Sequence, residues 1–368
     1  MRVGVPKEIK NHEYRVGLTP ASVAELVASG NEVFVETKAG TGIDFSDKAY
    51  EKAGATILPS ATDVFEKAEM IVKVKEPQAQ EIAMLRPHHL LFTYLHLAPD
   101  PEQAKGLMKS GATCIAYETV TSNSGALPLL KPMSEVAGRM SIQVGAHYLE
   151  KELGGRGVVL GGVPGVAPAK VAILGGGVAG INAAQMATGQ RADVTIYDIN
   201  NDRLAELDMH FGSQIKTAFA SKAAIAQAIQ EAELVIGAVL VPGAAAPKLV
   251  TRDQLKTMKR GSVLVDIAID QGGCFETSRA TTHDDPVYEI DGVIHYCVAN
   301  MPGAVARTST FALNNATLPF ALKLANLGAK LAMAEDPHLA AGLNVSGGKI
   351  RNLPVAEALE LPYEPVAA

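Results

Sequence analysis

The chain has 368 residues, of which 48% are hydrophobic and 20% charged, and its formal net charge is −6 at pH 7. This length exceeds what one hydrophobic core usually covers, so we expect two domains of ordinary size. The acidic balance and the lack of a long basic run argue against a nucleic-acid surface, so an anionic ligand would need local cations. The N-terminal residues lack the apolar segment of a signal peptide, and the three cysteines lack metal-ligand spacing, which predicts a cytoplasmic protein with reduced thiols.

The N-terminal third alternates between strand-like and helix-like segments, a pattern typical of parallel sheets with crossover helices. The expected strands are residues 2–5, 31–36, 70–74, 89–94 and 113–116. Expected helices between them include 19–29 and 101–110. The second of these begins at Pro101, which suits a first turn, and stops before Gly111.

The central part continues the alternation with a second set of strands. These are expected at 194–197, 234–237, 263–266 and 293–296, with helices at 202–210 and 223–232. The segment 154–168 is rich in glycine and proline and predicts a loop, whereas 131–153 predicts a long connecting helix.

The last helical segment, 308–334, has no expected strand partner of its own, so we place it back on the first domain. The prediction is an α/β fold of two Rossmann-like, doubly wound domains with mostly parallel sheets. A discontinuous substrate domain would comprise 1–128 plus 307–368, and a nucleotide-binding domain, 129–306, would be inserted into it.

The most informative stretch is 171–180, VAILGGGVAG, in which a short apolar strand leads into a Gly175-x-Gly177-x-x-Gly180 turn. The first glycine permits the tight turn, the second lets the backbone approach phosphates, and the third lets the next helix pack closely on the strand. That helix would direct unpaired N–H groups at the phosphates. The stretch therefore predicts a dinucleotide site, and its glycines and amides argue against a membrane span at the uncharged segment 171–190.

Asp198 ends the next expected strand, about 20 residues after the glycine turn, where an acid hydrogen-bonds the adenosine ribose of a bound dinucleotide. A carboxylate there repels a 2′-phosphate, which favours NAD over NADP. Arg203 is the counter-signal, although a cation at that position also suits the flank of a ribose. The cofactor that these residues predict is NAD.

Polar side chains also follow several expected strands, at the sheet edge where open α/β folds bind ligands. They are Arg15, Lys75, His96 and Asp270. Taken singly, each has an ordinary alternative: a surface ion pair, a solvated lysine, a satisfied core histidine and a turn-capping acid.

Taken together, the four residues fit hydride transfer on a small carboxylate. Arg15 offers a planar fork for a carboxylate, and Lys75 offers a compact cation that binds a carboxylate or polarises a carbonyl oxygen. His96 suits the acceptance and return of a proton near neutral pH. Asp270 adds a second acid/base group on the cofactor side, as the conversion of an amine to a carbonyl requires several proton transfers.

Several segments spread over the chain support a family resemblance. They are VGVPKEIKNHEYRVGLTP, IVKVKEP, FTYLHLA, PLLKPMSEVAGRMS, LGGGVAG, VIGAVLVPGAAAPKLV, DIAIDQGG and YCVANMPGAVARTST. Through them the chain resembles the alanine dehydrogenase family, which also includes transhydrogenase components, along essentially its whole length. The resemblance implies reversible oxidative deamination of L-alanine to pyruvate and ammonium with NAD, in a homo-hexamer of two-domain subunits.

By motif, the resemblance implies that Arg15 and Lys75 bind the substrate carboxylate and carbonyl, that His96 is the acid/base, and that Asp270 helps it handle water and ammonia. The NAD contacts that it implies, besides the glycines Gly175, Gly177 and Gly180, are Ser134, Val178, Ala179, Asp198, Arg203, Val239, Leu240, Ile267, Ala268, Ile269, Asp270, Arg279, Val298, Ala299, Asn300 and Met301.

One departure from the family pattern concerns the adenosine side. The family often has a serine followed by an asparagine before the helix that leads to VIGAVL, whereas this chain has Ala220 and then Ser221. The loss of one hydrogen bond there would weaken NAD binding by about 1 kcal/mol.

Three other functions fit parts of the pattern. The NAD(H)-binding component of a proton-translocating transhydrogenase shares the fold and turn, but it works with membrane partners and does not need the four polar residues. An NAD-sensing binding protein without chemistry is disfavoured by the same four residues. A lysine-pathway dehydrogenase would require a larger pocket, and pocket volume does not follow from sequence.

Overall fold

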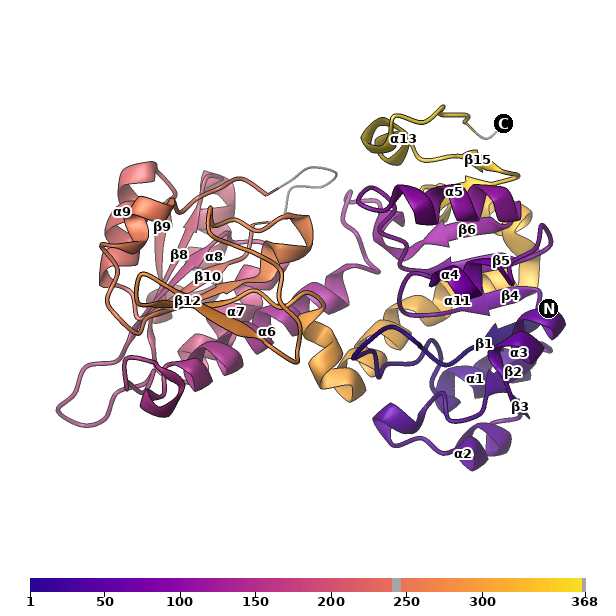
Figure 1. Cartoon of the computed structure of the whole chain (residues 1–368), viewed down its shortest axis with the longest axis horizontal. Coiled ribbons are helices and arrows are strands. Elements are labelled where there is room, and N and C mark those ends of the chain that lie inside the picture. Colours follow the sequence, from indigo (N-terminus) through magenta and orange to yellow (C-terminus); the bar gives the residue numbers. More distant parts are fainter. Residues whose placement is uncertain (240–245, 366–368) are drawn as a thin grey trace. The chain divides into compact units, whose positions relative to one another are not determined.

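The computed structural model describes residues 1–239 and 246–365, and the chain forms two compact units (Figure 1). Unit 1 comprises Met1–Met133 and Gly303–Ala368, and unit 2 comprises Ser134–Pro302. The limits expected from the sequence lie a few residues outside those of unit 2. The expected fold class is confirmed, because each unit is an α/β structure on a mostly parallel sheet.

Unit 1 is built on an eight-stranded sheet with the order β15-β14-β6-β5-β4-β1-β2-β3, which can be followed from top to bottom in Figure 1. Its strands are β1 (Arg2–Val5), β2 (Glu32–Glu36), β3 (Thr56–Leu58), β4 (Met70–Val72), β5 (Leu90–Thr93), β6 (Thr113–Ala116), β14 (Leu343–Ser346) and β15 (Lys349–Ile350). β1 to β6 are parallel, whereas β14 and β15 are antiparallel to their neighbours. Every residue of β4 and β5 is buried, as in parallel sheets covered on both faces.

The helices of unit 1 begin at local capping signals. The Thr19 side chain accepts a hydrogen bond from the Ser22 N–H before α1, and Asp100 accepts one from the Gln103 N–H before α5. Gly111, in the left-handed region with a φ of 73°, ends α5. The helices are α1 (Pro20–Ala28), α2 (Asp47–Lys52), α3 (Ala61–Lys67), α4 (Ala79–Ile82), α5 (Pro101–Ser110), α11 (Ala306–Glu335), α12 (Pro337–Ala340) and α13 (Leu353–Leu359), with 3-10 turns η1 (Thr41–Ile43) and η2 (Tyr117–Thr119).

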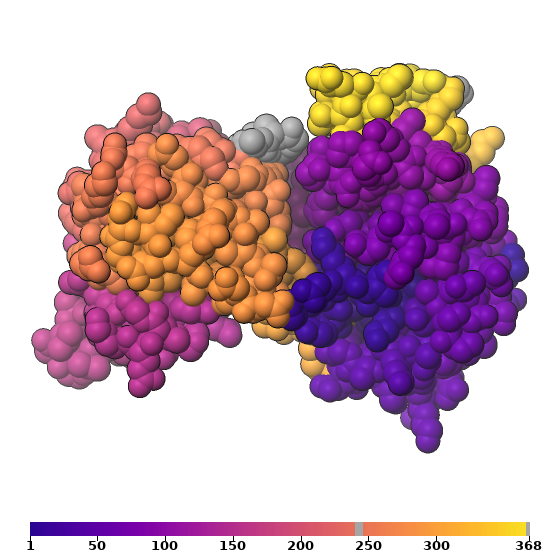
Figure 2. Space-filling view, viewed as in Figure 1, coloured from indigo at the N-terminus to yellow at the C-terminus, as the bar shows by residue number. Residues whose placement is uncertain are grey.

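The C-terminal segment completes the core of unit 1. Val345, Ile350 and Val355 are buried in the same cluster as Leu91 and Leu107. Figure 2 shows this segment, in yellow, packed against purple residues of the same unit. The expectation that the last helix has no strand partner was wrong, because β14 follows α11 and extends the sheet at β6.

Unit 2 is built on a seven-stranded sheet with the order β12-β13-β11-β10-β7-β8-β9. Its strands are β7 (Lys170–Leu174), β8 (Asp193–Asp198), β9 (Lys216–Phe219), β10 (Leu234–Gly237), β11 (Val263–Asp266), β12 (Val287–Ile290) and β13 (Val293–Tyr296). All pairs are parallel except β12 with β13. The strand order reverses at β7, which has β8 on one side and β10 on the other. Such a reversal opens a crevice at the carboxyl end of the strand.

One predicted element of this region was too long. The helix expected over 131–153 ends as α6 at Tyr148, and a separate 3-10 turn follows. After the 3-10 turn, the Gly155 N–H donates to the backbone carbonyl oxygen of Glu150, and Gly154 has a φ of 88°. Turn hydrogen bonds therefore replace helical ones in this segment. The helices of unit 2 are α6 (Lys131–Tyr148), which begins in unit 1, α7 (Val178–Gly189), α8 (Asn201–Phe211), α9 (Lys222–Glu231) and α10 (Arg252–Leu255), with 3-10 turns η3 (Lys151–Leu153), η4 (Gly212–Gln214), η5 (Ile267–Gln271) and η6 (Met301–Val305).

The described parts of the chain contain neither a membrane-spanning helix nor a cluster of metal-ligating side chains. No helix there combines the length and the hydrophobicity that a membrane span requires. Residues 1–239 and 246–365 also contain no group of three or more His, Cys, Asp and Glu side chains that could hold a metal ion.

Candidate active site

The glycine turn of unit 2 connects β7 to α7 at the reversal of strand order. Gly175 has a φ of 106°, and a Cβ there would lie 2.8 Å from the Ala238 oxygen. A Cβ on Gly180 would lie 1.9 Å from the Gly175 oxygen, so the turn itself excludes larger residues at both positions. Gly177, the N-cap of α7, has an extended conformation and no described atom within 4 Å of its Cβ position. The fold does not require glycine at Gly177, whereas close approach of a pyrophosphate to the backbone does.

The side chains of Asp198 and Arg203 both bind the backbone of Gly176, in the middle of this turn. Asp198 Oδ2 accepts a hydrogen bond of 2.7 Å from the Gly176 N–H, and Arg203 Nε donates one of 2.6 Å to the Gly176 oxygen. Asp198 Oδ1 accepts from the Asn200 N–H at 2.9 Å. The acid therefore lies at the turn, as a ribose-binding acid must, and it also holds the turn in shape.

The other predicted cofactor residues of unit 2 follow neighbouring parallel strands at the same sheet edge. Val239 follows β10, Ile267 to Asp270 form η5 after β11, and Val298 to Met301 follow β13, while Leu240 lies outside the described residues. Ser134 belongs to α6, which approaches α7 so closely that a Cβ on Gly138 would lie 2.2 Å from the Ala179 oxygen. The guanidinium of Arg279 lies 4.1 Å from the centre of the Tyr288 ring.

Ala220 stands at the position where the family often has a serine. Ala220 donates its N–H to the backbone carbonyl oxygen of Asp198 at 2.9 Å, and it has no side-chain hydroxyl. The hydroxyl of the following Ser221 caps α9 by accepting from the Ala224 N–H at 3.1 Å. Ser221 therefore already uses its hydroxyl within the protein.

Asp266, the last residue of β11, is a functional candidate that the sequence argument missed. Its buried carboxylate accepts from the Ala268 N–H at 3.0 Å, the Cys274 N–H at 2.9 Å and the Ser278 hydroxyl at 2.5 Å. Burial raises the pKa of Asp266, and these hydrogen bonds oppose the rise. Asp266 thus fixes the ends of the turn that contains the exposed Asp270.

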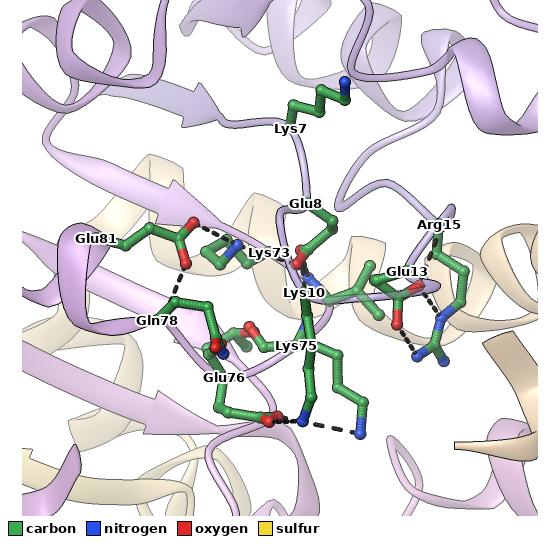
Figure 3. A network of polar contacts seen from close by, with 12 residues as sticks. Lys7, Glu8, Lys10, Glu13, Arg15, Lys73, Lys75, Glu76, Gln78 and Glu81 are labelled. Atoms are coloured by element: carbon green, nitrogen blue, oxygen red, sulfur yellow. Dashed lines mark hydrogen bonds and ion pairs between the residues drawn. The ribbon is translucent and has the colours of Figure 1, made fainter. Parts of the chain in front are cut away.

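In unit 1, Arg15 lies in the loop after β1 and is only 2% exposed. Its Nε donates to Glu13 Oε1 at 2.7 Å and its Nη2 to Glu13 Oε2 at 2.5 Å, while Nη1 lies 3.1 Å from the Met133 sulfur. Burial lowers the pKa of the Arg15 guanidinium, but the hydrogen bonds and charge of Glu13 outweigh this and raise it. Arg15 therefore does form an ion pair with Glu13, as its ordinary alternative role required. The pair is buried and not on the surface, and it fixes the orientation of the guanidinium (Figure 3).

Lys75 follows β4 and is 8% exposed, so it is not a solvated surface lysine. Its N–H lies 3.4 Å from Glu8 Oε1, and its carbonyl oxygen accepts from the Thr93 hydroxyl at 3.0 Å. Its Nζ lies 4.0 Å from Glu76, which also pairs with Lys10. Burial raises the pKa of Glu76, but the charges of both lysines outweigh it, so the pKa is lowered.

A buried triad is centred on Lys73, two residues before Lys75, and the sequence did not indicate it. Lys73 Nζ lies 3.0 Å from Glu8 Oε2 and 2.7 Å from Glu81 Oε1, and Figure 3 shows the three side chains converging. Glu8 Oε1 accepts from the Val74 N–H at 2.7 Å. Burial raises the pKa of Glu8, although Lys73 lowers it in part. The repeated lysines of MIVKVKEP were the available signal, but only Lys75 was assigned a role.

His96 follows β5 and is half-buried. Its ring lies parallel to that of Tyr94, with 5.6 Å between centroids and 7° between planes. Because β5, β4 and β1 are neighbours in the sheet, His96, Lys75 and Arg15 come from three adjacent carboxyl strand ends. A hollow of about 510 Å³ is lined by residues 7–15, including Arg15, and by residues 38, 39, 41 and 42, whereas Lys75 and His96 are not among its lining residues.

These observations define a class of protein. Unit 2 has a dinucleotide-type glycine turn at a topological switch point, and unit 1 presents two cations and a histidine at adjacent strand ends. An α/β enzyme of two Rossmann-like domains, of the dinucleotide-dependent dehydrogenase type, has this combination.

Comparison with known proteins gives the family. Residues 4–137 match the family described as alanine dehydrogenase/PNT, N-terminal domain, and residues 141–353 match alanine dehydrogenase/PNT, C-terminal domain. The chain belongs to the alanine dehydrogenase/PNT family, which confirms the resemblance found in the sequence.

The relatives cover the whole chain. An alanine dehydrogenase of Halomonas elongata is 59% identical over 100% of this chain and 99% of its own length, and that of Bacillus subtilis is 56% identical over 99% and 96%. A solved L-alanine dehydrogenase is similar with a TM-score of 0.95 and 54% identity, covering 98% of this chain and 99% of that one. A transhydrogenase from Sinorhizobium meliloti is more distant, with a TM-score of 0.81 and 28% identity over 96% and 99%.

Proposed function

We propose that this protein is an alanine dehydrogenase, which catalyses the reversible NAD-dependent oxidative deamination of L-alanine to pyruvate and ammonium. The observation that supports it best is the set of Arg15, Lys75 and His96 at adjacent strand ends of unit 1, in a chain whose unit 2 has a glycine turn suited to a dinucleotide. Full-length identity of 54–59% to alanine dehydrogenases supports the choice of alanine as substrate.

The residues of unit 2 fit NAD. The backbone from Gly175 to Gly180 and the start of α7 would hold the pyrophosphate, and Asp198 would accept hydrogen bonds from the ribose hydroxyls. When bound, NAD supplies the nicotinamide that accepts the hydride from the alanine Cα. The remaining contacts follow the family resemblance: Ser134, Val178, Ala179, Arg203, Val239, Leu240, Ile267, Ala268, Ile269, Asp270, Arg279, Val298, Ala299, Asn300 and Met301.

Arg15 and Lys75 hold the substrate in this proposal. A guanidinium oriented by Glu13 gives a carboxylate a fixed direction of approach, because its fork cannot rotate while two of its nitrogens are bonded. Lys75, with its backbone held on both sides, would bind the carboxylate or the carbonyl oxygen.

His96 and Asp270 move the protons. His96 would accept a proton from the attacking water and return one to the departing amine, and Asp270 would assist in handling water and ammonia. Replacement of His96 by alanine would then abolish turnover and leave NAD binding nearly intact.

The family resemblance also supports a homo-hexamer in the cytoplasm, with L-alanine, pyruvate and ammonium as the small-molecule partners. Light scattering on the purified protein gives the molar mass, and any value other than six subunits would contradict the hexamer.

The decisive test is absorbance at the NADH band after the protein is mixed with NAD and L-alanine at alkaline pH, with L-lysine, glycine and NADP as controls. Alanine-dependent NADH formation is expected. NAD binding without such a signal would instead favour a transhydrogenase-like component or an NAD sensor, and a stronger signal with L-lysine would favour a lysine-pathway dehydrogenase.

A further inference from the structure

The backbone of His96 has an unusual conformation. Its φ is 49°, in the left-handed region that residues with a Cβ rarely occupy. Such a conformation persists only where the surroundings hold it, and it often marks a functional position.

Glu118 provides the contacts. Its Oε1 accepts hydrogen bonds from the Leu95 N–H at 3.1 Å and the His96 N–H at 2.6 Å, and its Oε2 lies 3.2 Å from the Leu95 nitrogen. These N–H groups lie just beyond β5, which ends at Thr93. Hydrogen bonds to an ionised carboxylate are shorter and stronger than those between neutral groups.

The backbone around Glu118 is itself anchored to the neighbouring strands of the sheet. It belongs to η2, directly after β6, and β6 is the parallel neighbour of β5. The adjacent Tyr117 is buried and donates its hydroxyl to the Lys73 oxygen at 3.0 Å, which ties η2 to the end of β4. On the other side of the loop, Gln103 of α5 donates to the Leu95 oxygen at 2.9 Å.

The imidazole ring is held separately from the backbone. Tyr94 lies parallel to the His96 ring, and its own hydroxyl donates to the Leu129 oxygen at 2.5 Å. Tyr94 therefore limits the plane of the ring, whereas the Glu118 carboxylate limits the direction in which the Cα–Cβ bond points.

We propose that Glu118 is a positioning residue for His96: its carboxylate keeps the Leu95–His96 backbone in the conformation that presents the imidazole for proton transfer. The role rests on the proposed function of His96. Because proton transfer depends on the placement of the acid/base group to within about 1 Å, loss of the clamp should reduce turnover more than substrate or cofactor binding.

The kinetic test compares wild type, Glu118→Ala and the nearly isosteric Glu118→Gln as full-length proteins. We expect kcat for alanine oxidation to fall on the order of 100-fold in Glu118→Ala, with NADH affinity and the KM for alanine little changed. Glu118→Gln keeps an acceptor oxygen but loses the charge, so its kcat should lie between the two. Glu102→Ala removes an exposed glutamate of α5 that pairs with Lys105, and it should leave kcat unchanged.

Amide hydrogen exchange tests the clamp without activity. In Glu118→Ala the peptide that contains Leu95 and His96 should exchange faster, while peptides from β1 should not change. Unchanged exchange in the alanine and glutamine variants would overturn the clamp, and faster exchange with normal kcat would overturn the positioning role. If the wild type forms no alanine-dependent NADH, the proposed function fails on its own, and the exchange result still decides whether Glu118 holds this backbone.

Discussion

Arg15 combines a buried structural contact with the substrate-binding role that we propose for it. Its side chain is bonded twice to Glu13 and both side chains are buried, so the pair is fixed before any ligand arrives. A lysine could not replace it, because an ammonium lacks the planar fork that bonds a carboxylate through two nitrogens. A buried charge that lost this partner would be left uncompensated, which costs more than the pair itself contributes.

Asp198 combines a charge with hydrogen bonds from the Gly176 and Asn200 N–H groups, and Asp198→Asn removes the charge while it keeps one acceptor oxygen. The amide oxygen can still accept from the Gly176 N–H, but the negative charge that repels a 2′-phosphate is gone, and Arg203 stays nearby. We expect the ratio of kcat/KM for NADP to that for NAD to rise at least about tenfold, which corresponds to about 1.4 kcal/mol.

Steady-state kinetics with both cofactors measures this ratio. Asp202→Asn, on the exposed face of α8, is the matched control and should leave it unchanged. A ratio that does not change in Asp198→Asn would mean that the acid does not discriminate between the cofactors.

His295, buried on β13, should make the stability of the protein depend on pH. Its Nδ1 lies 3.0 Å from the Val293 oxygen and its Nε2 2.8 Å from the Thr277 hydroxyl, and burial lowers its pKa from 6.5 to about 4. The folded state therefore binds fewer protons than the unfolded state between these values. The stabilisation is fully present above pH 6.5 and is lost as the pH falls toward 4, by about 3 kcal/mol.

Urea unfolding at pH 7 and pH 4.5 in wild type and His295→Gln measures this contribution. The glutamine variant should lose less free energy of unfolding over this interval than the wild type. Equal losses would show that His295 is not the titrating group.

At the scale of elements, the end of β4 is held by charges rather than by ladder bonds alone. Two buried carboxylates share one buried lysine: burial lowers the pKa of Lys73, but Glu8 and Glu81 outweigh it and raise the pKa. The same Glu8 carboxylate accepts from the backbone just before Lys75. The triad therefore links the stability of unit 1 to the position of Lys75, a residue predicted to bind the substrate.

Removal of the Lys73 cation should lower the free energy of unfolding far more than removal of one carboxylate charge. Lys73→Met leaves two buried carboxylates without a counter-ion, so we expect the free energy of unfolding to fall by about 3–5 kcal/mol at pH 7. Glu8→Gln leaves one lysine with one carboxylate and keeps an acceptor oxygen, and it should cost about 1 kcal/mol. Urea unfolding measures both, and equal costs would contradict the account of the triad.

At the scale of the whole molecule, the chain has a separate hydrophobic core in each unit. A ligand that binds one unit should therefore protect that unit first. At a concentration 100 times its Kd, NAD stabilises the state that binds it by about 2.7 kcal/mol.

Hydrogen exchange with and without NAD tests this assignment. Amides of the glycine turn and of the end of β8 should exchange more slowly with NAD, while those of β1 in unit 1 should change little. Gly180→Ala is the control, because its Cβ would lie 1.9 Å from the Gly175 oxygen and the turn must shift. Protection confined to unit 1 would contradict NAD binding at the turn.

Several elements could be predicted from the sequence because their signals are local. β1, β6, β10 and α5 begin and end where expected: the three strands are short, mostly apolar runs, and α5 begins at Pro101 and ends before Gly111. Other elements were missed, among them β3, β9 and β14. They are short or lie near the edge of a sheet, so they are stabilised by pairing with a neighbour rather than by their own pattern.

The same division holds for the candidate site. The glycine turn, Asp198, and the polar residues after strands are placed by rules that depend on a few adjacent residues, so the sequence by itself determined them as candidates. The groups that hold them, such as Glu8 for Lys75 and Glu118 for His96, lie more than 20 residues away along the chain. Only the tertiary structure decided these pairings, because a carboxylate finds its partner through the packing of neighbouring strands and not through sequence spacing.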